Sequence, residues 1–507
     1  MRTGYPISRH PRRRLPARLC TFTLALAAAG CAVGPDFVAP PPPQVSGYTA
    51  QGDGDRTAVG DGQSQRFEAA GEGTAQWWQL FGSPQLNEVV AQAVNGNPTL
   101  QAAQASLRQS RDNLRAGQGV FFPQLEGDAG ATRQQYSAAR VGEALPPSIF
   151  NLFTLSASVS YAVDLFGGER RTVEGLRASV DYQRQTLDAA YISLTANVAN
   201  TVVAAAAYRA EIDATQDIIG ALREQVRLAQ TQAEAGTAPY TAVLGLRTQL
   251  SATEATLPAL QQKLDQAGDL LAALTGHVPA EWVAPPVSLS GLKLPSDIPL
   301  SLPSELVAHR PDILAAEAQL HAASANIGVA TAAMLPSLSL SGSYGAQSTA
   351  SSDLFKSGSN VWSVGAGLSA PLFEGGTLWY RRKAAVAAYE QAQAAYRQVV
   401  LSAFVQVADS LRALQHDADA VEAQAQQLDA ARENRHLVEA AYQAGLSAYT
   451  ELLLADVQSR QAELGYLQAK ALRLQDTVAL FVALGGSWRQ PEAAQAGIAA
   501  DQSGGGS

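Results

Sequence analysis

The stretch AGTAPYT at residues 235–241 recurs as AGLSAYT at residues 444–450, an offset of 209 residues. Upstream, NPTLQAA at residues 97–103 recurs as RPDILAA at residues 310–316, an offset of 213. An offset that drifts by only a few residues over most of the chain indicates an internal duplication. We therefore expect the 507 residues to fold as two copies of one unit, not as several unrelated domains.

Each copy shows the same order of predicted elements. A helix, at residues 98–119 or 312–333, is followed by two segments in which apolar and small polar residues alternate, which is typical of strands. These segments are long enough to cross a bilayer when tilted, and a membrane barrel needs one face for lipid and one for the lumen. A soluble hairpin with one hydrated face would show the same pattern. The four segments are residues 125–136, 152–165, 338–346 and 361–372.

Proline and glycine mark the places where strand and helix should meet. Glycine permits the abrupt change of backbone conformation that such a junction needs. We expect the junctions at Pro123, Gly167, Gly168, Pro336, Gly375 and Gly376.

A proline-free stretch follows each strand pair, at residues 169–234 and 378–444. As unbroken helices, each would reach on the order of 100 Å. Apolar and small residues recur there at steps of three and four, which predicts coiled-coil packing. In the second copy this pattern lapses at Arg432 and Arg435. Each long helix should end at a glycine in the left-handed conformation and be followed by a returning helix, at 240–275 or 449–484.

The N-terminus is typical of a secretory signal. Six arginines precede an apolar run at residues 19–29 that is too short to span a bilayer. The run leads through small residues into Cys31, a pattern that resembles a bacterial lipoprotein signal with Cys31 as the acylated first residue. An ordinary cleavage site beside a buried cysteine is the alternative. Without residues 1–30, 30 basic and 45 acidic side chains remain, so the formal charge changes from −9 to −15.

No segment after the leader is a convincing transmembrane helix, so any crossing of a membrane must be made by strands. Four strands cannot close a barrel, and open edges in lipid leave costly unpaired backbone groups. Subunits must therefore pool their strands, giving 8 in a dimer, 12 in a trimer or 16 in a tetramer. The expected fold class is a mixed α and β membrane protein, a pooled β-barrel continued by an α-helical barrel.

Six regions follow from these patterns. They are a signal peptide at 1–30, an acylated extended segment at 31–75, the first repeat at 76–276, a linker at 277–303, the second repeat at 304–486 and a flexible tail at 487–507.

Four short motifs together resemble one family. They are CAVGPDF at 31–37, WW at 77–78 with Phe81, RPDI at 310–313 and ALGGSW at 483–488. Their combination is similar to the TolC-like outer-membrane efflux proteins, in the lipoprotein branch that serves resistance-nodulation-division pumps. The resemblance implies a homotrimer with a 12-stranded barrel in the bacterial outer membrane, lipid-anchored at Cys31 and extending far into the periplasm. It also implies a periplasmic adaptor and a proton-driven inner-membrane pump as partners.

The resemblance further implies a passive duct that is closed near its periplasmic end. In similar proteins an aspartate lies five residues after the tyrosine that matches Tyr449, but here that position is Leu454. We expect an apolar constriction at Leu454, with Glu451 and Asp456 nearby, although all three could simply pack or face solvent. The tip residues Gly236, Thr237, Gly445 and Leu446 are the candidates for adaptor contact, although helix capping alone would also account for the glycines.

Other classes of function have less support. The negative charge disfavours a nucleic-acid binder, and the six histidines show no metal-ligand or catalytic spacing. We therefore expect no enzyme, no metal site and no cofactor. A type I secretion tunnel for protein and a non-transport coiled-coil surface scaffold remain as alternatives to an exit duct for drugs or other small molecules.

Overall fold

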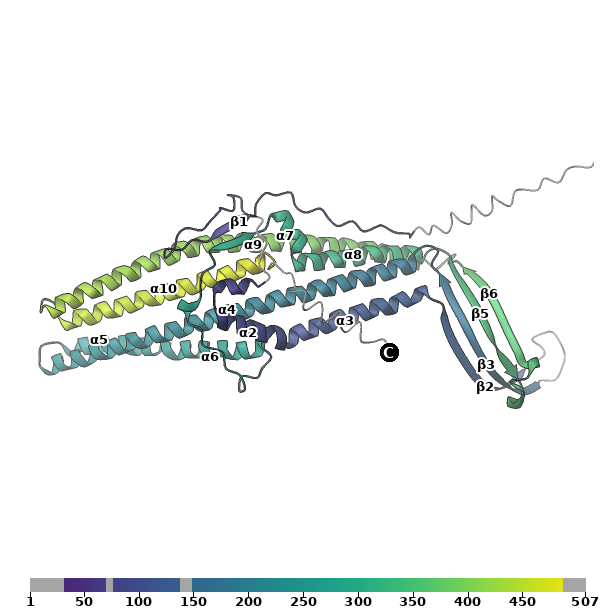
Figure 1. Cartoon of the computed structure of the whole chain (residues 1–507), viewed down its shortest axis with the longest axis horizontal. Helices are drawn as coiled ribbons and strands as arrows, with labels where there is room; N and C mark the ends of the chain where they lie inside the picture. The colour runs from purple at the N-terminus through teal and green to yellow at the C-terminus, as the bar shows by residue number, and fades with distance from the viewer. Residues whose placement is uncertain (1–31, 70–75, 137–147, 487–507) are drawn as a thin grey trace, which may run out of the picture. The chain divides into compact units, whose positions relative to one another are not determined.

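The computed structural model describes residues 32–69, 76–136 and 148–486, in two compact units. The sheet unit comprises residues 32–38, Arg111–Ser179 and Leu320–Ala392 within this range. The helical unit comprises Ala39–Ser110, Val180–Gln319 and residues 393–486. Both units draw on both halves of the chain, as the mixed colours of Figure 1 show. Cys31, the signal peptide at 1–30 and the tail at 487–507 lie outside the described residues.

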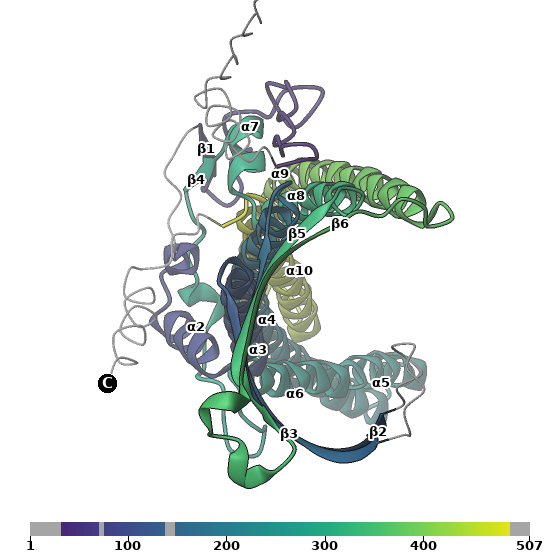
Figure 2. The same cartoon turned by 90° about the vertical axis from the view of Figure 1, so that its right-hand side faces the viewer.

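The sheet unit is built on four antiparallel strands in the order β2-β3-β5-β6. In Figure 2 they form one continuous curved sheet. The predicted strand segments are confirmed to within a few residues. The strands are β2 (Gln124–Tyr136), β3 (Ser148–Val163), β5 (Ser337–Ser348) and β6 (Asn360–Ser369).

The strand register gives this sheet two chemically different faces. Opposed residues of an antiparallel pair share a face. One row across the sheet is Glu126, Ser158, Ser343 and Ser363, and a neighbouring row on the opposite face is Leu125, Val159, Gly342 and Val364. Continued along the strands, the first face carries mainly hydroxyl, amide and carboxylate groups and glycines, and the second mainly apolar side chains. The alternation read in each segment therefore combines into a polar and an apolar surface.

Proline and glycine stand at the strand–helix junctions, as expected. Pro123 and Pro336 directly precede β2 and β5. Gly167 and Gly376 have φ angles of +80° and +86°, which side chains rarely adopt. The helices that begin or end at these junctions are α3 (Pro98–Gln118), α4 (Gly168–Glu234), α8 (Pro311–Ala332) and α9 (Thr377–Gln443). With 67 residues each, α4 and α9 are ~100 Å long.

The two copies differ in their returning helices. In the second copy it is the single helix α10 (Tyr449–Ala483), but in the first it is divided into α5 (Tyr240–Glu254) and α6 (Thr256–Leu274). The sequence predicted one helix in both copies. Pro258 explains the difference, because it has no N–H to bond the carbonyl of Glu254 and its ring crowds that turn.

The segment before the first repeat and the linker between repeats pair with one another. β1 (Arg66–Ala69) lies parallel to β4 (Asp297–Leu300), with Arg66 opposite Asp297. Sequence patterns did not predict this sheet, because strands of four residues are too short to show alternation. Among the described residues, the remaining helices are α2 (Pro84–Gly96), α7 (Pro303–His309) and the 3₁₀ turns η1 (Trp77–Phe81), η2 (Gly119–Phe121), η4 (Leu289–Gly291), η5 (Ser351–Asp353) and η6 (Ser357–Ser359).

Equivalent contacts in the two copies support the duplication. In the first copy, the side-chain N–H of Asn97 donates to the carbonyl of Leu274 at 2.9 Å. In the second, Arg310 occupies the place of Asn97 and donates to the carbonyl of Ala483 at 2.6 Å. Each copy thus joins the start of its first helix to the end of its returning helix. The sequence motifs around Arg310 and Ala483 are in direct contact for this reason.

The predicted coiled-coil seams are largely buried within the helical unit. Leu222 of α4 is fully buried with Ile218 and Val457, and Leu411, Leu414 and Val421 are buried along α9. α4 contains the one stretch, among the described helices, that is long and apolar enough to span a membrane, and 61% of that stretch is buried within the chain. We therefore interpret α4 as a packed core helix.

Candidate functional site

Two tight turns join the long helices to the helices that follow them. Gly236 and Gly445 have φ angles of +73° and +74° and are exposed. At the second turn the amides of Gly445 and Leu446 donate to the carbonyls of Tyr442 and Ala441, which satisfies the last carbonyls of α9. Thr237 caps the first helix in the same way, through its amide and hydroxyl to Gln232. The capping prediction is therefore confirmed, and the apolar side chain of Leu446 is 84% exposed.

The three gate candidates near the second turn have different surroundings. Leu454 is 53% exposed. Glu451 in the first turn of α10 accepts a hydrogen bond from Ser447. Asp456 is half-buried and forms an ion pair with Arg435 of α9 at 2.7 Å. The structure therefore places an exposed apolar side chain between one solvated and one paired carboxylate.

The two arginines at which the predicted seam lapses both form ion pairs with α10. Arg432 lies 3.4 Å from Glu463, just as Arg223 lies 2.8 Å from Glu254 at the equivalent place in the first copy. The Arg435–Asp456 pair has no such counterpart, because Val226 and Arg247 occupy the equivalent positions. This pair is therefore the charged contact that distinguishes the α9–α10 hairpin from its counterpart.

A buried arginine on α10 holds the N-terminal segment against the helical unit. Arg473 is 3% exposed and donates to the carbonyls of Gly60 and Gln63 and to the side chains of Thr57 and Gln65. Burial lowers the pKa of Arg473, and the nearby carboxylates of Asp417 and Asp61 oppose that shift. Sequence patterns did not single out Arg473, because its partners are more than 400 positions away.

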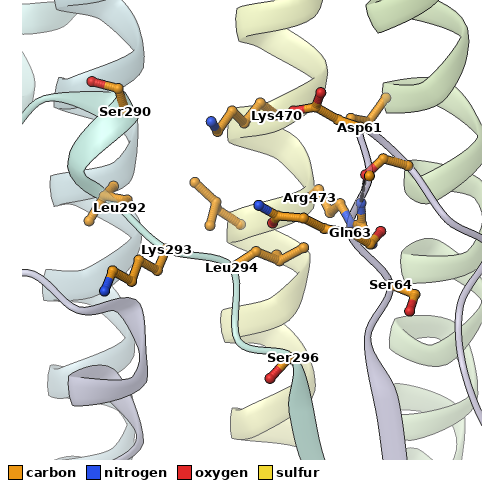
Figure 3. Close-up of a pocket in the computed structure, with 14 residues that line it drawn as sticks. Asp61, Gln63, Ser64, Ser290, Leu292, Lys293, Leu294, Ser296, Lys470 and Arg473 are labelled. Carbon is orange, nitrogen blue, oxygen red and sulfur yellow. Dashed lines mark hydrogen bonds between the residues drawn. The ribbon is translucent and has the colours of Figure 1, made fainter.

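A cavity of about 590 Å³ lies beside Arg473. Figure 3 shows Asp61, Gln63 and Lys470 on one side and Leu292 and Lys293 of the linker on the other. Serine hydroxyls and two lysines make its lining mostly polar and basic. This cavity lies where residues 60–64 pack against the helical unit. Among the described residues, no three His, Cys, Asp or Glu side chains lie close enough together to hold a metal ion.

Two aspartates meet between α9 and α10 near Arg473. Asp417 is 7% exposed, and one of its carboxylate oxygens has no hydrogen-bond partner. Burial and the neighbouring carboxyl group of Asp476 raise the pKa of Asp417 to about 7, while Arg473 opposes the shift. Asp417 therefore keeps its proton to a higher pH than a free aspartate does.

The comparisons with known proteins agree with this geometry. A family model described as outer membrane efflux protein matches residues 89–277 and 302–486, one match per copy. The pyoverdine export outer membrane protein OpmQ of Pseudomonas aeruginosa is 31% identical over 438 residues, which cover 84% of this chain and 90% of OpmQ. The toluene efflux pump outer membrane protein TtgF of Pseudomonas putida is 29% identical over 487 residues, covering 92% of this chain and 96% of TtgF.

A solved structure supports the same fold. The outer-membrane channel OprN superposes with a TM-score of 0.79 at 27% identity, covering 90% of this chain and 99% of that one. Both the family model and these relatives describe outer-membrane components of efflux systems. The chain belongs to the outer membrane efflux protein family and acts as an outer-membrane exit duct.

Proposed function

We propose that three copies of this chain form the passive exit duct of a tripartite pump that exports drugs or other small molecules. The observation that carries the proposal is the two-faced sheet continued by helices of 67 residues. A polar face suits a water-filled lumen and an apolar face suits lipid. Three such sheets supply 12 strands, within the range in which bacterial barrels close.

The same proposal includes a lipid anchor and two protein partners. An acyl chain on Cys31 would hold the periplasmic side of the duct to the outer membrane. The exposed turns at Gly236, Thr237, Gly445 and Leu446 would contact a periplasmic adaptor, which connects the duct to a proton-driven inner-membrane pump. The duct itself then needs no cofactor and no energy source, and substrate selection rests with the pump.

We further propose that the α9–α10 hairpin closes the duct at rest. Leu454 supplies an apolar side chain, and the Arg435–Asp456 pair holds that hairpin in one conformation. Because the pair is partly exposed, its own contribution to stability is about 1 kcal/mol or less. A small contribution of this size suits a contact that must break when the duct opens.

Conductance of the purified trimer in planar bilayers tests duct and gate together. We expect a low conductance for the wild type that increases several-fold in Leu454→Ser and in Asp456→Asn, since each removes one part of the closure. Glu254→Gln, which breaks the exposed pair of the first copy, is the matched control and should leave conductance unchanged. If Leu454→Ser and Asp456→Asn both conduct like the wild type, the gate assignment is wrong. A trimer with no conductance in any variant would favour the scaffold alternative.

A deletion strain tests the cargo. We expect increased susceptibility to several small toxic compounds, restored by the wild-type gene on a plasmid. Loss of secretion of one protein, with susceptibility unchanged, would instead identify a type I secretion tunnel. The names of OpmQ and TtgF, which refer to pyoverdine export and toluene efflux, favour the small-molecule outcome.

A further inference from the structure

The first described residues lie across the junction between β3 and α4. The amide of Val33 donates to the carbonyl of Phe166 at 2.9 Å. Ala32 packs directly on Gly167, where a Cβ would lie only 2.6 Å from the Cα of Ala32. Ala32, which follows Cys31 in the chain, is therefore in contact with the turn that connects β3 to α4.

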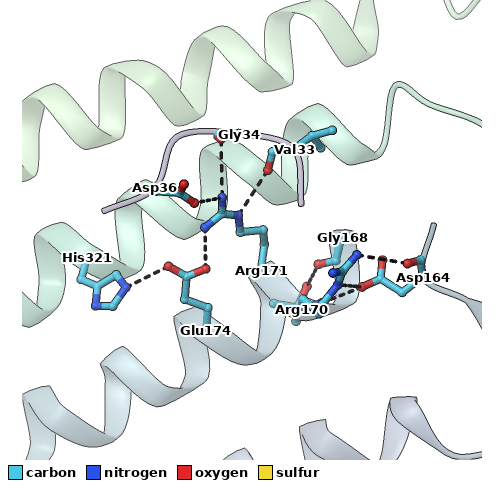
Figure 4. Close-up of polar contacts among 10 residues, drawn as sticks. Val33, Gly34, Asp36, Asp164, Gly168, Arg170, Arg171, Glu174 and His321 are labelled. Atoms are coloured by element: carbon cyan, nitrogen blue, oxygen red, sulfur yellow. Dashed lines mark hydrogen bonds and ion pairs between the residues drawn. The ribbon is translucent and has the colours of Figure 1, made fainter. Parts of the chain in front are cut away.

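Arg171 of α4 holds this segment through its whole guanidinium group, as Figure 4 shows. Its nitrogens donate to the carbonyl of Val33 at 3.2 Å and to the carbonyl of Gly34 at 3.5 Å. They also reach Asp36 at 2.7 Å and Glu174 at 2.8 Å. The Arg171 side chain is only 5% exposed, and a charge buried to this degree is stable only when it is paired and hydrogen-bonded. Such a planar fork binds several oxygens at once, which a lysine cannot reproduce.

Neighbouring residues complete the contact. His321 of α8 lies 2.9 Å from the second oxygen of Glu174, and the ring of Phe37 stacks on His321 at 4.4 Å. Burial opposes ionisation of Glu174, but hydrogen bonds from Arg171 and His321 outweigh it and lower the pKa of Glu174. The carboxylate therefore remains charged and keeps both partners in place.

Two glycines allow the backbones to approach closely. Gly34 has a φ angle of +96°, and a Cβ there would lie 2.4 Å from the Cα of Gly328 in α8. A Cβ on Gly328 would in turn meet Arg171 and the carbonyl of Val33. Both sides of this contact, Gly34 in the segment and Gly328 in α8, thus lack a side chain that would keep the two backbones apart.

The second copy of the repeat lacks this arrangement. Counted from the glycine pairs, Trp379 takes the place of Arg171 and Arg382 that of Glu174. The leucine and phenylalanine of that junction, Leu372 and Phe373, are 96% and 90% exposed, whereas Leu165 is 38% exposed. The cluster therefore exists only in the copy that receives the N-terminal segment, so general stability of the junction does not account for it.

We infer that Arg171, together with Gly34 and Gly328, forms a fastening site. It holds residues 32–37, which follow Cys31, at the junction of β3 and α4 and so positions the lipid anchor. This inference rests on the proposed acylation of Cys31. An anchor held here transmits its attachment to β3 and α4, whereas a loose segment would leave the duct free to move on a flexible tether.

Hydrogen exchange on the purified full-length protein tests the fastening. Arg171→Gln should speed exchange of the Val33 amide at least tenfold, because the carbonyls beside it lose their donor. Arg170→Gln is the matched control, since Arg170 precedes Arg171 in α4 but binds Asp164. Equal exchange in both variants would overturn the fastening site.

A second pair of variants leaves Arg171 intact, in case its loss impairs folding. Gly34→Ala adds a methyl group that collides with Gly328 and should also free the Val33 amide. Gly52→Ala is its control, because Gly52 has a similar φ of +88° but open space around the position of a Cβ. If Gly34→Ala exchanges no faster than Gly52→Ala, the close contact does not fasten the segment.

A double-mutant cycle tests the link to the anchor. Arg171→Gln is combined with Cys31→Ser behind an ordinary signal peptide, and the melting midpoint of the protein is measured in membranes. We expect Arg171→Gln to lower the midpoint at least twice as much in the acylated protein as in the unacylated one. Equal losses would limit Arg171 to a structural role and overturn the positioning. Palmitate labelling of the wild type separates the proposed acylation of Cys31 from the fastening site. If the protein takes up no palmitate but shows the expected hydrogen exchange, the lipid anchor is refuted and only the fastening site remains.

Discussion

One buried carboxyl group, that of Asp417, is expected to make the stability of this protein depend on pH. Asp417 lies between α9 and α10, facing Asp476 and Arg473, with Asp61 next to Arg473. Its pKa is about 7 in the folded chain against 3.8 for the free side chain. The folded state binds the proton of Asp417 more tightly than the unfolded state does. Protonated Asp417 therefore stabilises the folded state at low pH, and this contribution to the free energy of unfolding is lost as pH increases towards 7. The difference between the two pKa values corresponds to about 4 kcal/mol of unfolding free energy at most.

Asp417→Asn should therefore stabilise the protein at pH 8 and have little effect at pH 4. The amide preserves the shape of the protonated carboxyl group and removes the buried charge. The check is the melting midpoint of the variant and the wild type between pH 4 and pH 8, with the exposed Asp419→Asn as control. A constant difference across that range would mean that Asp417 does not titrate there.

Other important residues escaped sequence reasoning for a physical reason. Arg171 and Arg473 are buried arginines that each bind a segment 135 or more positions away, at Asp36 for one and at Gln65 for the other. A pattern within one segment carries no information about such partners. By contrast, Arg432 and Arg435 were visible in the sequence because they interrupt an apolar seam, and both are paired in the structure.

Elements with a strong local period were the predictable ones. The four long strands and the helices α3, α4, α8, α9 and α10 follow from alternation, from steps of three and four, and from the absence of proline. The β1–β4 pair could not be found, because each strand depends on its distant partner more than on its own sequence. The break between α5 and α6 had a visible signal in Pro258, which should have divided the predicted helix.

The two faces of the sheet make a prediction for neighbouring residues of β6. Val364 lies on the apolar face and Ser363 on the polar face, near the middle of the strand. An arginine near the centre of a lipid-facing strand costs about 2–4 kcal/mol, whereas one in a watery lumen is tolerated. Val364→Arg should therefore reduce the amount of folded protein in the outer membrane, and Ser363→Arg should not.

Heat-modifiable migration on gels and the quantity in outer-membrane fractions measure this difference. Ser363→Arg in addition should change the conductance of the trimer, because it adds a positive charge to the lumen. If both arginines are tolerated equally, the assignment of lumen and lipid faces is wrong.

At the scale of the whole molecule, the two edge strands are the places at which the subunits of the proposed trimer would join. β2 and β6 each have a neighbour on one side only within the described chain. Repeat symmetry predicts how they pair between subunits, because β6 corresponds to β3 and β2 corresponds to β5. Transferring the observed pairing of Val159 with Gly342 places Ala366 opposite Ala129 of the next subunit. The β5–β6 pairing is shifted by two residues relative to the β2–β3 pairing. Val364 and Leu368, two residues to either side of Ala366, are therefore the alternative partners of Ala129.

Cysteine cross-linking tests this closure. Ala129→Cys combined with a cysteine at residue 364, 366 or 368 should give disulfide-linked trimers on oxidation, most efficiently at 366. A bond within one chain is excluded, because β2 and β6 are separated by two strands and thus by roughly 14 Å, twice the reach of a disulfide. Ala129→Cys with Gly365→Cys is the matched control, since residue 365 lies on the opposite face. Linked trimers would show that β6 of one subunit pairs with β2 of the next. Monomers in every combination would mean that the barrel, if it closes, closes by another pairing of edges.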